Sequence, residues 1–171
     1  MKKVIVALAL MLGVSLSTFA QDYSVKRGYK GFIDFGYSQN VGMDGVANEI
    51  SGYDSNKIFW STSHGYQFNP YLYLGAGVAA NYYFDAECFG LPFFAHVRGN
   101  ILNNKISPYV DFRIGYSPLE DVRGFYMAPS IGCKIYSFNV SLGYVMQKIT
   151  DSYYDISENF SGFSLKVGFE F

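Results

Sequence analysis

The two histidines are the side chains of this sequence best suited to acid–base chemistry, because imidazole titrates near neutral pH. A catalytic histidine also needs a nucleophile or a carboxylate at a matching spacing. The residue two positions before His64 is Thr62, and the residue two positions after His96 is Arg98. Neither neighbour completes a catalytic set. We therefore predict that both histidines are structural and that the chain has no catalytic residue, cofactor or metal ion.

Two cysteines and two acidic segments are the remaining candidates for chemistry. Cys88 and Cys133 show no metal-ligand spacing, and the strands proposed below place them near opposite ends of the fold, so we expect free thiols. Segments 39–53 and 149–160 carry acidic side chains and tyrosines. Neither fits a calcium-loop pattern, so we expect polar loops that offer a surface to a binding partner.

The composition excludes several classes of protein. The chain has 171 residues, of which 50% are hydrophobic and 16% are charged, so we expect one folded domain rather than a disordered chain. Its formal net charge is −1, and no basic stripe is present that would neutralise phosphates. We therefore predict no binding to nucleic acid.

The amino-terminal residues have the organisation of a secretory signal peptide. Two lysines precede an apolar run, and small residues suited to a cleavage site follow it. The apolar run is short for a transmembrane helix, which needs about 20 residues. We predict that 1–20 is a cleaved signal peptide, that 21–27 is a short segment, and that 28–171 is the folded domain.

Hydrophobic and polar side chains alternate with a period of two through most of the mature chain, which predicts β-strands. The predicted strands cover 29–38, 57–68, 72–82, 91–101, 106–117, 125–135, 138–145 and 163–171. Most have roughly the ten residues that a tilted strand needs to cross a bilayer. One face of each strand is apolar, whereas the other carries glycine, serine, asparagine and charged residues.

The connections between these strands alternate in length. Short turns lie near 69–70, 103–105 and 136–137, and longer loops cover 39–53, 84–90, 118–124 and 149–160. A meander with tight turns at one end and longer loops at the other is typical of outer-membrane barrels. We therefore predict an all-β fold, an eight-stranded antiparallel up-and-down transmembrane β-barrel.

A lipocalin-like soluble barrel has the same number of strands, but its hydrophobic side chains point inward. Glycines argue against it, because an eight-stranded barrel has room inside only for packed side chains. They lie on the polar face at Gly36, Gly65, Gly75, Gly77, Gly115, Gly132, Gly143 and Gly168. The apolar face carries aromatic residues near strand ends, at Tyr29, Tyr37, Tyr66, Phe68, Tyr82, Tyr116 and Phe171. Interfacial girdles lie at those heights, so both patterns favour the membrane barrel.

The polar face would place charged side chains inside the barrel. They are Lys30, Asp34, Lys57, Arg98, Asp111, Arg113, Lys134, Lys166 and Glu170. An unpaired charge in a crowded lumen is costly, so we expect ion pairs. Across the hairpin that turns at 103–105, Arg98 faces Asp111. His96 also points inward, as a lumen histidine with satisfied hydrogen bonds, whereas His64 faces lipid near the short-turn end.

The seam between the first and last strands poses a separate question, because the two must pair antiparallel for closure. One register brings Lys30 beside Glu170 and, at the same time, Asp34 beside Lys166. Our hypothesis is that this ionic seam fixes closure. The alternative is that the lumen charges pair with whichever neighbours lie nearest.

Alternating hydrophobic residues end the chain, at Phe163, Leu165, Val167, Phe169 and Phe171. With the hairpin over 65–71 and the Gly75-Ala76-Gly77 segment, this run resembles small outer-membrane β-barrel proteins of Bacteroidetes, which are similar to the eight-stranded OmpX and OmpA barrels. The resemblance implies contact with outer-membrane lipid and recognition of the closing run, as an assembly signal, by the barrel-insertion machinery. We expect a monomer.

The expected function is a structural or surface-interaction role through the loops at 39–53 and 149–160, with a packed lumen and no catalysis. A small-solute pore is the alternative, and an enzyme that modifies lipid A is a further one. A large water-filled channel would need about sixteen strands, which argues against a porin-sized opening.

Overall fold

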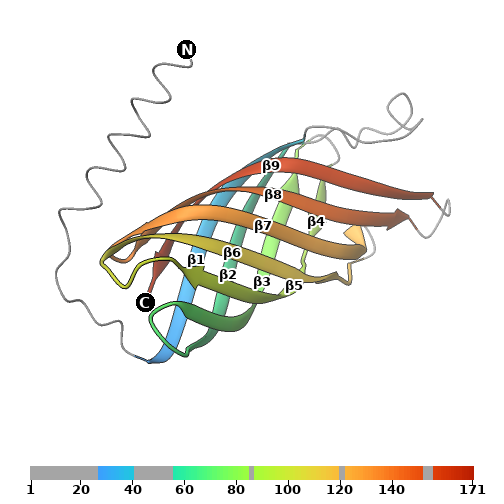
Figure 1. The fold of residues 1–171 in the computed structure, drawn as a ribbon. Helices are drawn as coiled ribbons and strands as arrows, with labels where there is room; N and C mark the ends of the chain where they lie inside the picture. Colours follow the sequence, from blue (N-terminus) through green and yellow to red (C-terminus); the bar gives the residue numbers. More distant parts are fainter. Residues whose placement is uncertain (1–26, 41–55, 85–86, 120–121, 152–155) are drawn as a thin grey trace, which may run out of the picture.

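Strands make up most of the described residues, which are 27–40, 56–84, 87–119, 122–151 and 156–171 of a computed structural model (Figure 1). The strands are β1 (Gly28–Asn40), β2 (Lys57–Gln67), β3 (Leu72–Tyr83), β4 (Cys88–Gly90), β5 (Phe93–Asn100), β6 (Ile106–Ser117), β7 (Gly124–Ile135), β8 (Phe138–Asp151) and β9 (Ile156–Glu170). Among these residues, no helix is long and apolar enough to cross a membrane.

Successive strands pair antiparallel around a closed ring, and β9 pairs with β1 to complete it. Both β4 and β5 pair with β3 in one continuous register, in which Gly90 faces Asn81 and Phe93 faces Val78. They are therefore one barrel strand, interrupted where Pro92 has no N–H to donate. The predicted eight-stranded antiparallel up-and-down barrel is confirmed.

The strand bounds differ most from the predicted ones in two places. Residues 88–90 belong to β4, although the sequence predicted a loop over 84–90. The last two strands are longer than predicted, and they pair with each other up to Asp151 and Ile156, so much of the predicted loop over 149–160 is a hairpin. The sequence there is mostly polar and lacks the apolar alternation that marks the other strands, which is why the pattern missed it.

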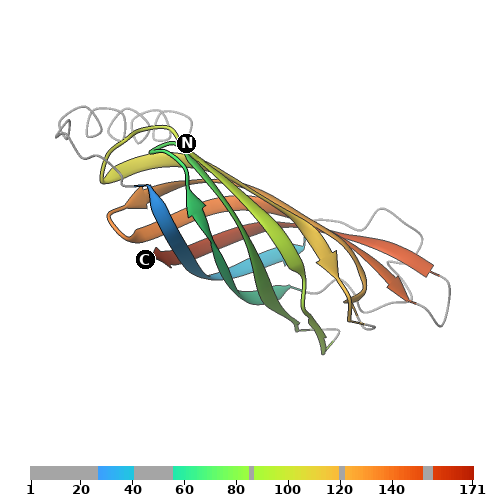
Figure 2. The same cartoon turned by 90° about the horizontal axis from the view of Figure 1, so that it is seen from below.

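The β8–β9 hairpin extends past the rim of the barrel (Figures 1 and 2). The pairing of β7 with β8 ends at Gln147, and the pairing of β1 with β9 ends at Gly162, whereas β8 and β9 continue together. The long-loop end of the barrel is therefore asymmetric. The predicted signal peptide, residues 21–26 and residues 41–53 of the first loop lie outside the described part of the chain.

Glycines on the inner face let neighbouring strands approach closely. A Cβ atom on Gly65 would lie 2.2 Å from the carbonyl oxygen of Leu74, and one on Gly115 would lie 1.9 Å from that of Phe93. Both distances are far below van der Waals contact, so no larger residue fits without a backbone shift. The polar-face glycines thus belong to a crowded interior, as the sequence predicts.

Candidate functional site: the polar network of the lumen

The burial of side chains is inverted relative to a soluble protein. The lumen holds Asp34, Lys57, Arg98, Asp111, Arg113, Lys134, Lys166 and Glu170 as buried residues, with Lys30 half-buried. The outer surface instead exposes 66% of Ile131, 63% of Leu142 and 62% of Trp60. Charged residues are almost never fully buried unless they are paired, so the partners of these charges decide whether the arrangement is stable.

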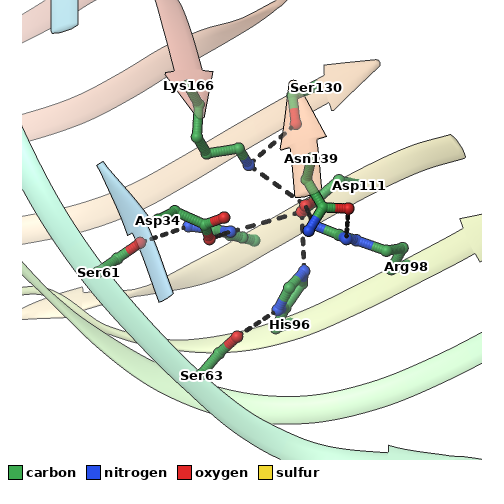
Figure 3. Close-up of polar contacts among 10 residues, drawn as sticks. Asp34, Ser61, Ser63, His96, Arg98, Asp111, Ser130, Asn139 and Lys166 are labelled. Carbon is green, nitrogen blue, oxygen red and sulfur yellow. Dashed lines mark hydrogen bonds and ion pairs between the residues drawn. The ribbon is translucent and has the colours of Figure 1, made fainter. Parts of the chain in front are cut away.

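Asp111 is the centre of the network and is completely buried (Figure 3). Its Oδ2 atom accepts hydrogen bonds from Arg98 Nη2 at 2.9 Å and from Lys166 Nζ at 3.2 Å. Its Oδ1 atom lies 3.0 Å from His96 Nε2 and 3.5 Å from Arg113 Nε. One carboxylate therefore joins four basic side chains. The pairing of Arg98 with Asp111 across the hairpin is the one that the sequence predicts.

Asp34 is the second buried anion of the network. It accepts a short hydrogen bond from Arg113 Nη2, and the other terminal nitrogen of that guanidinium donates to Ser61 Oγ at 2.9 Å. Arg113 thus bridges the two buried carboxylates, Asp34 and Asp111. Because these residues come from β1, β2 and β6, the bridge crosses the lumen instead of running along one pair of strands.

The ionic seam proposed from the sequence is wrong in its register. Asp34 faces Gly168 on β9, two residues from the predicted partner Lys166. Lys30 still reaches Glu170 Oε1 at 3.1 Å by a diagonal contact, but Lys166 reaches Asp111 instead. The physical reason is space, because a Cβ atom at position 168 would lie 2.0 Å from Asp34 Oδ1. Glycine at this position leaves room for the carboxylate that turns toward Arg113.

Further polar side chains complete the network. His96 Nδ1 lies 2.7 Å from Ser63 Oγ, Arg98 Nη1 donates to Asn139 Oδ1 at 3.0 Å, and Lys166 Nζ donates to Ser130 Oγ at 3.3 Å. At the short-turn end, Lys30 and Lys134 share Glu170, the latter at 3.2 Å. The charges therefore pair with their nearest neighbours, which is the alternative that the sequence left open.

Ser63, His96 and Asp111 form a chain of the kind that activates a nucleophilic serine. Ser63 and His96 are 1% and 0% exposed, so no substrate atom touches the hydroxyl in this conformation. Asp111 is also held by two arginines and a lysine, which compete for its charge. The geometry is that of a packed polar core. His96 points inward as predicted, but only its Nδ1 atom is hydrogen-bonded, because Nε2 lies near Asp111 without forming a hydrogen bond.

Aromatic rings clamp the arginine beside this chain. The guanidinium carbon of Arg98 lies 4.1 Å from the ring centroid of Phe32 and 4.1 Å from that of Tyr109, a cation–π sandwich. Tyr73 packs edge-on against Phe32 at 4.8 Å and against His96 at 5.1 Å. The rings fill the lumen between the charges.

The sequence reasoning missed these rings as part of the site. The signal that could have predicted them is their position, because Phe32, Tyr73 and Tyr109 lie on the glycine-rich face of their predicted strands. A large ring among small residues on the inner face predicts a side chain that fills the lumen, and three such rings on three strands predict a stack.

An apolar layer lies on the long-loop side of the ionic network. It consists of the buried residues Ala79, Phe94, Tyr126, Ala128 and Val145. Phe94 and Tyr126 stand at one level, because both face Gly115 in register, and their ring centroids are 6.0 Å apart. An apolar layer of this kind opposes the passage of ions.

A second polar group and a loop residue lie beyond that layer. Tyr83 donates a hydrogen bond to Gln147 Oε1 at 2.7 Å and receives one from Lys57 Nζ at 3.3 Å. Val122, from the loop between β6 and β7, is fully buried against Tyr83 and Cys88. The lumen is thus filled at several successive levels.

The outer surface carries the remaining predicted residues. The strand-end aromatic residues are all exposed: Tyr29, Tyr37, Tyr66, Phe68, Tyr82, Tyr116 and Phe171. The closing run is exposed in the same way, at Phe163, Leu165, Val167, Phe169 and Phe171. His64 faces outward near the short-turn end, as predicted, and no disulfide joins Cys88 and Cys133.

Comparisons with known proteins give little detail. No family model matches the chain, and no curated protein matches it. A similar solved structure, described as "De novo design of transmembrane beta-barrels", has 10% sequence identity and a TM-score of 0.45. The alignment covers 90% of this chain and 99% of that chain.

Proposed function

We propose that this protein is an integral β-barrel of a bacterial outer membrane, with a plugged lumen and a structural or surface-interaction role at its long-loop end. The observation that carries the proposal is the inverted burial. Arg98 and Asp111 lie inside at 1% and 0% exposure, whereas large apolar side chains cover the outside. A contiguous apolar surface of this extent is unstable in water and is stabilised by lipid.

The backbone supports the same proposal. A closed barrel pairs every strand with two neighbours, so it leaves no edge whose polar groups lipid would have to satisfy. Exposed tyrosine and phenylalanine residues lie at both ends of the strands, the depth at which aromatic girdles contact the membrane interfaces. The predicted signal peptide and the outward closing run fit export followed by insertion through the barrel-insertion machinery.

The filled lumen favours a structural or interaction role over a pore. The ionic network, the apolar layer and the Tyr83 group lie one after another along the axis. Ser63 and His96 are buried within this network, which supports a role without catalysis. We propose that the function lies in what the barrel displays at its long-loop end.

The β8–β9 hairpin supports a contact with a partner at that end. Beyond Gln147 and Gly162, the described strands of the barrel do not continue beside it, so its outer edges face away from the barrel. A strand edge offers backbone donors and acceptors to an extended partner segment. The first predicted loop, 39–53, begins beside the same hairpin, because Asn40 faces Gly162.

Membrane fractionation tests the proposal. The full chain, expressed with its leader in a Gram-negative host, should enter the outer-membrane fraction and need detergent for extraction. Folded barrel should migrate faster than heated protein in denaturing gels. Recovery of a monomeric, water-soluble protein without detergent would refute the placement.

The interaction role has its own test. Intact cells that display the wild-type protein should retain a surface partner, whereas a variant with residues 149–158 shortened to a tight turn should lose it. A variant with the turn at 136–137 lengthened by the same number of residues is the matched control, because that turn lies at the opposite end. Equal retention by all three proteins would exclude the hairpin as the contact.

A further inference from the structure

His64 interrupts the apolar outer surface at the short-turn end of the barrel. It faces outward on β2, three residues before Gln67, where that strand ends. Its in-register neighbours are small, Gly31 on β1 and Ala76 on β3, and the ring of Phe171 lies over Gly31. A polar ring on a lipid-facing surface is costly unless polar groups bind it.

Two hydroxyl groups hold the imidazole in place. Tyr29 OH lies 2.6 Å from His64 Nδ1, and Thr62 Oγ1 lies 3.0 Å from His64 Nε2. The ring also stacks on Tyr29 and meets the edge of Phe171, each with a centroid distance of 6.1 Å. The three polar groups therefore form a fixed cluster on the outer surface.

The hydrogen-bond donors and acceptors of this cluster show what it can bind. A neutral imidazole has one N–H donor and one acceptor, so one hydroxyl donates to the ring while the other receives from it and keeps a free O–H. In either tautomer the cluster therefore offers an O–H donor on the outer surface, which matches an acceptor oxygen of a phosphodiester.

An apolar groove continues from the same cluster. It has a volume of about 320 Å³, and its outward-facing lining residues are Ile33, Trp60, Thr62, Val78, Ala80 and Leu91. Thr62 belongs to both the cluster and the groove. From Thr62 the groove extends toward Ala80, which is closer to the long-loop end of β3, and thus away from the short-turn rim. Polar recognition at the rim and an apolar channel toward the middle of the barrel fit the two parts of one lipid molecule.

We propose that Tyr29, Thr62 and His64 bind the phosphodiester headgroup of a phospholipid, whose acyl chain lies in the groove beside Trp60 and Ala80. The inference rests on the proposed function, because it needs the outer surface to face lipid. It adds a specific lipid site to that surface. Arg27, exposed just before β1, adds a cation on the same rim and favours an anionic headgroup.

The test is a titration of the folded protein in phosphate-free maltoside micelles, followed by the NMR shifts of the His64 imidazole. Three probes are compared: dihexanoyl phosphatidylglycerol, dihexanoylglycerol and inorganic phosphate. We expect a saturable shift with phosphatidylglycerol alone. An equal shift with inorganic phosphate would show a simple anion site, and no shift with any probe would show that these residues bind none of the three. Either result overturns the proposal.

Matched variants locate the site. Tyr29→Phe and Thr62→Val should each weaken the apparent affinity for phosphatidylglycerol about tenfold, the ratio that corresponds to about 1.4 kcal/mol. Tyr66→Phe removes a hydroxyl from the same rim and should leave the affinity unchanged. If Tyr66→Phe weakens binding as much as Tyr29→Phe does, the assigned cluster is wrong.

The groove has its own pair of variants. Ala80→Phe fills it and should weaken binding, whereas Val97→Phe adds the same ring elsewhere on the outer surface and should not. Each variant is first shown to fold and insert like the wild type. Failure of the wild type itself to insert into vesicles would count against the membrane placement, whereas normal insertion without the variant effects would count against the lipid site alone.

Discussion

Replacing Asp111 with asparagine removes the carboxylate that joins the lumen network while keeping nearly the same side-chain volume. In the native lumen, Asp34 and Asp111 face three cations, Arg98, Arg113 and Lys166, which leaves one positive charge in excess with His96 neutral. Without the Asp111 charge the excess becomes two. All five of these ionic side chains are buried, so water does not screen the repulsion effectively.

The expected loss follows from that geometry. Removing one partner from a buried ion pair costs about 3–5 kcal/mol. Asparagine still offers one oxygen to Arg98, so we expect the lower end, about 3 kcal/mol in the free energy of unfolding. Urea unfolding of the barrel in lipid vesicles, followed by tryptophan fluorescence from Trp60, measures this difference.

A rescue variant and a control make the prediction specific. Lys166→Met in the Asp111→Asn background returns the excess charge to one and should recover about half of the loss, because the coupling between contacting charges is non-additive. Ser130→Ala removes a hydroxyl that binds Lys166 without changing any charge and should cost about 1 kcal/mol. The electrostatic reasoning is refuted if Asp111→Asn costs no more than Ser130→Ala, or if Lys166→Met worsens the loss.

Three further predictions concern the glycines, the seam between β1 and β9, and conduction through the lumen. Gly115→Ala should destabilise the barrel by about 1–3 kcal/mol in the same assay, because the added methyl carbon would meet a backbone carbonyl, whereas Gly99→Ala, with no such contact closer than 4.0 Å, should be nearly neutral. With both native cysteines replaced by serine, cysteines at Ile33 and Phe169 should cross-link on oxidation, because these residues face each other, and cysteines at Ile33 and Val167 should not. The opposite pattern would restore the register predicted from the sequence. Planar-bilayer recordings of the wild type should show no sustained large currents. Any residual conductance should favour anions, because six basic and three acidic side chains of the described residues face the lumen.

Which side of each strand faces the lumen was predictable from the amino-acid sequence alone. Period-two alternation is a local property of the chain, and it assigns every residue of a strand to one of two faces without any knowledge of neighbouring strands. The pairing of Arg98 with Asp111 was also predictable, because the short turn between β5 and β6 leaves only a few registers for that hairpin. Closure followed from the number of strands and the alternating length of their connections.

The β8–β9 hairpin shows where the alternation of hydrophobic and polar residues no longer predicts strands. Its outer part lies past the last residues that pair with β7 and β1, and its sequence lacks the period-two alternation. Backbone hydrogen bonds between two adjacent strands hold it, and these place little demand on side-chain type. The missing alternation therefore predicted a loop over 149–160, although residues there pair as strands.

The partners of the lumen charges and the alignment of the seam depended on the tertiary structure. Asp34 binds Arg113 from across the bore, and Lys166 binds Asp111, although neither pair lies on adjacent strands. In a narrow barrel, side chains from opposite strands are within reach of one another, so the nearest partner depends on the packing of the whole cross-section. The seam register likewise follows from a glycine that makes room for Asp34, a steric fact that appears only when the first and last strands lie side by side.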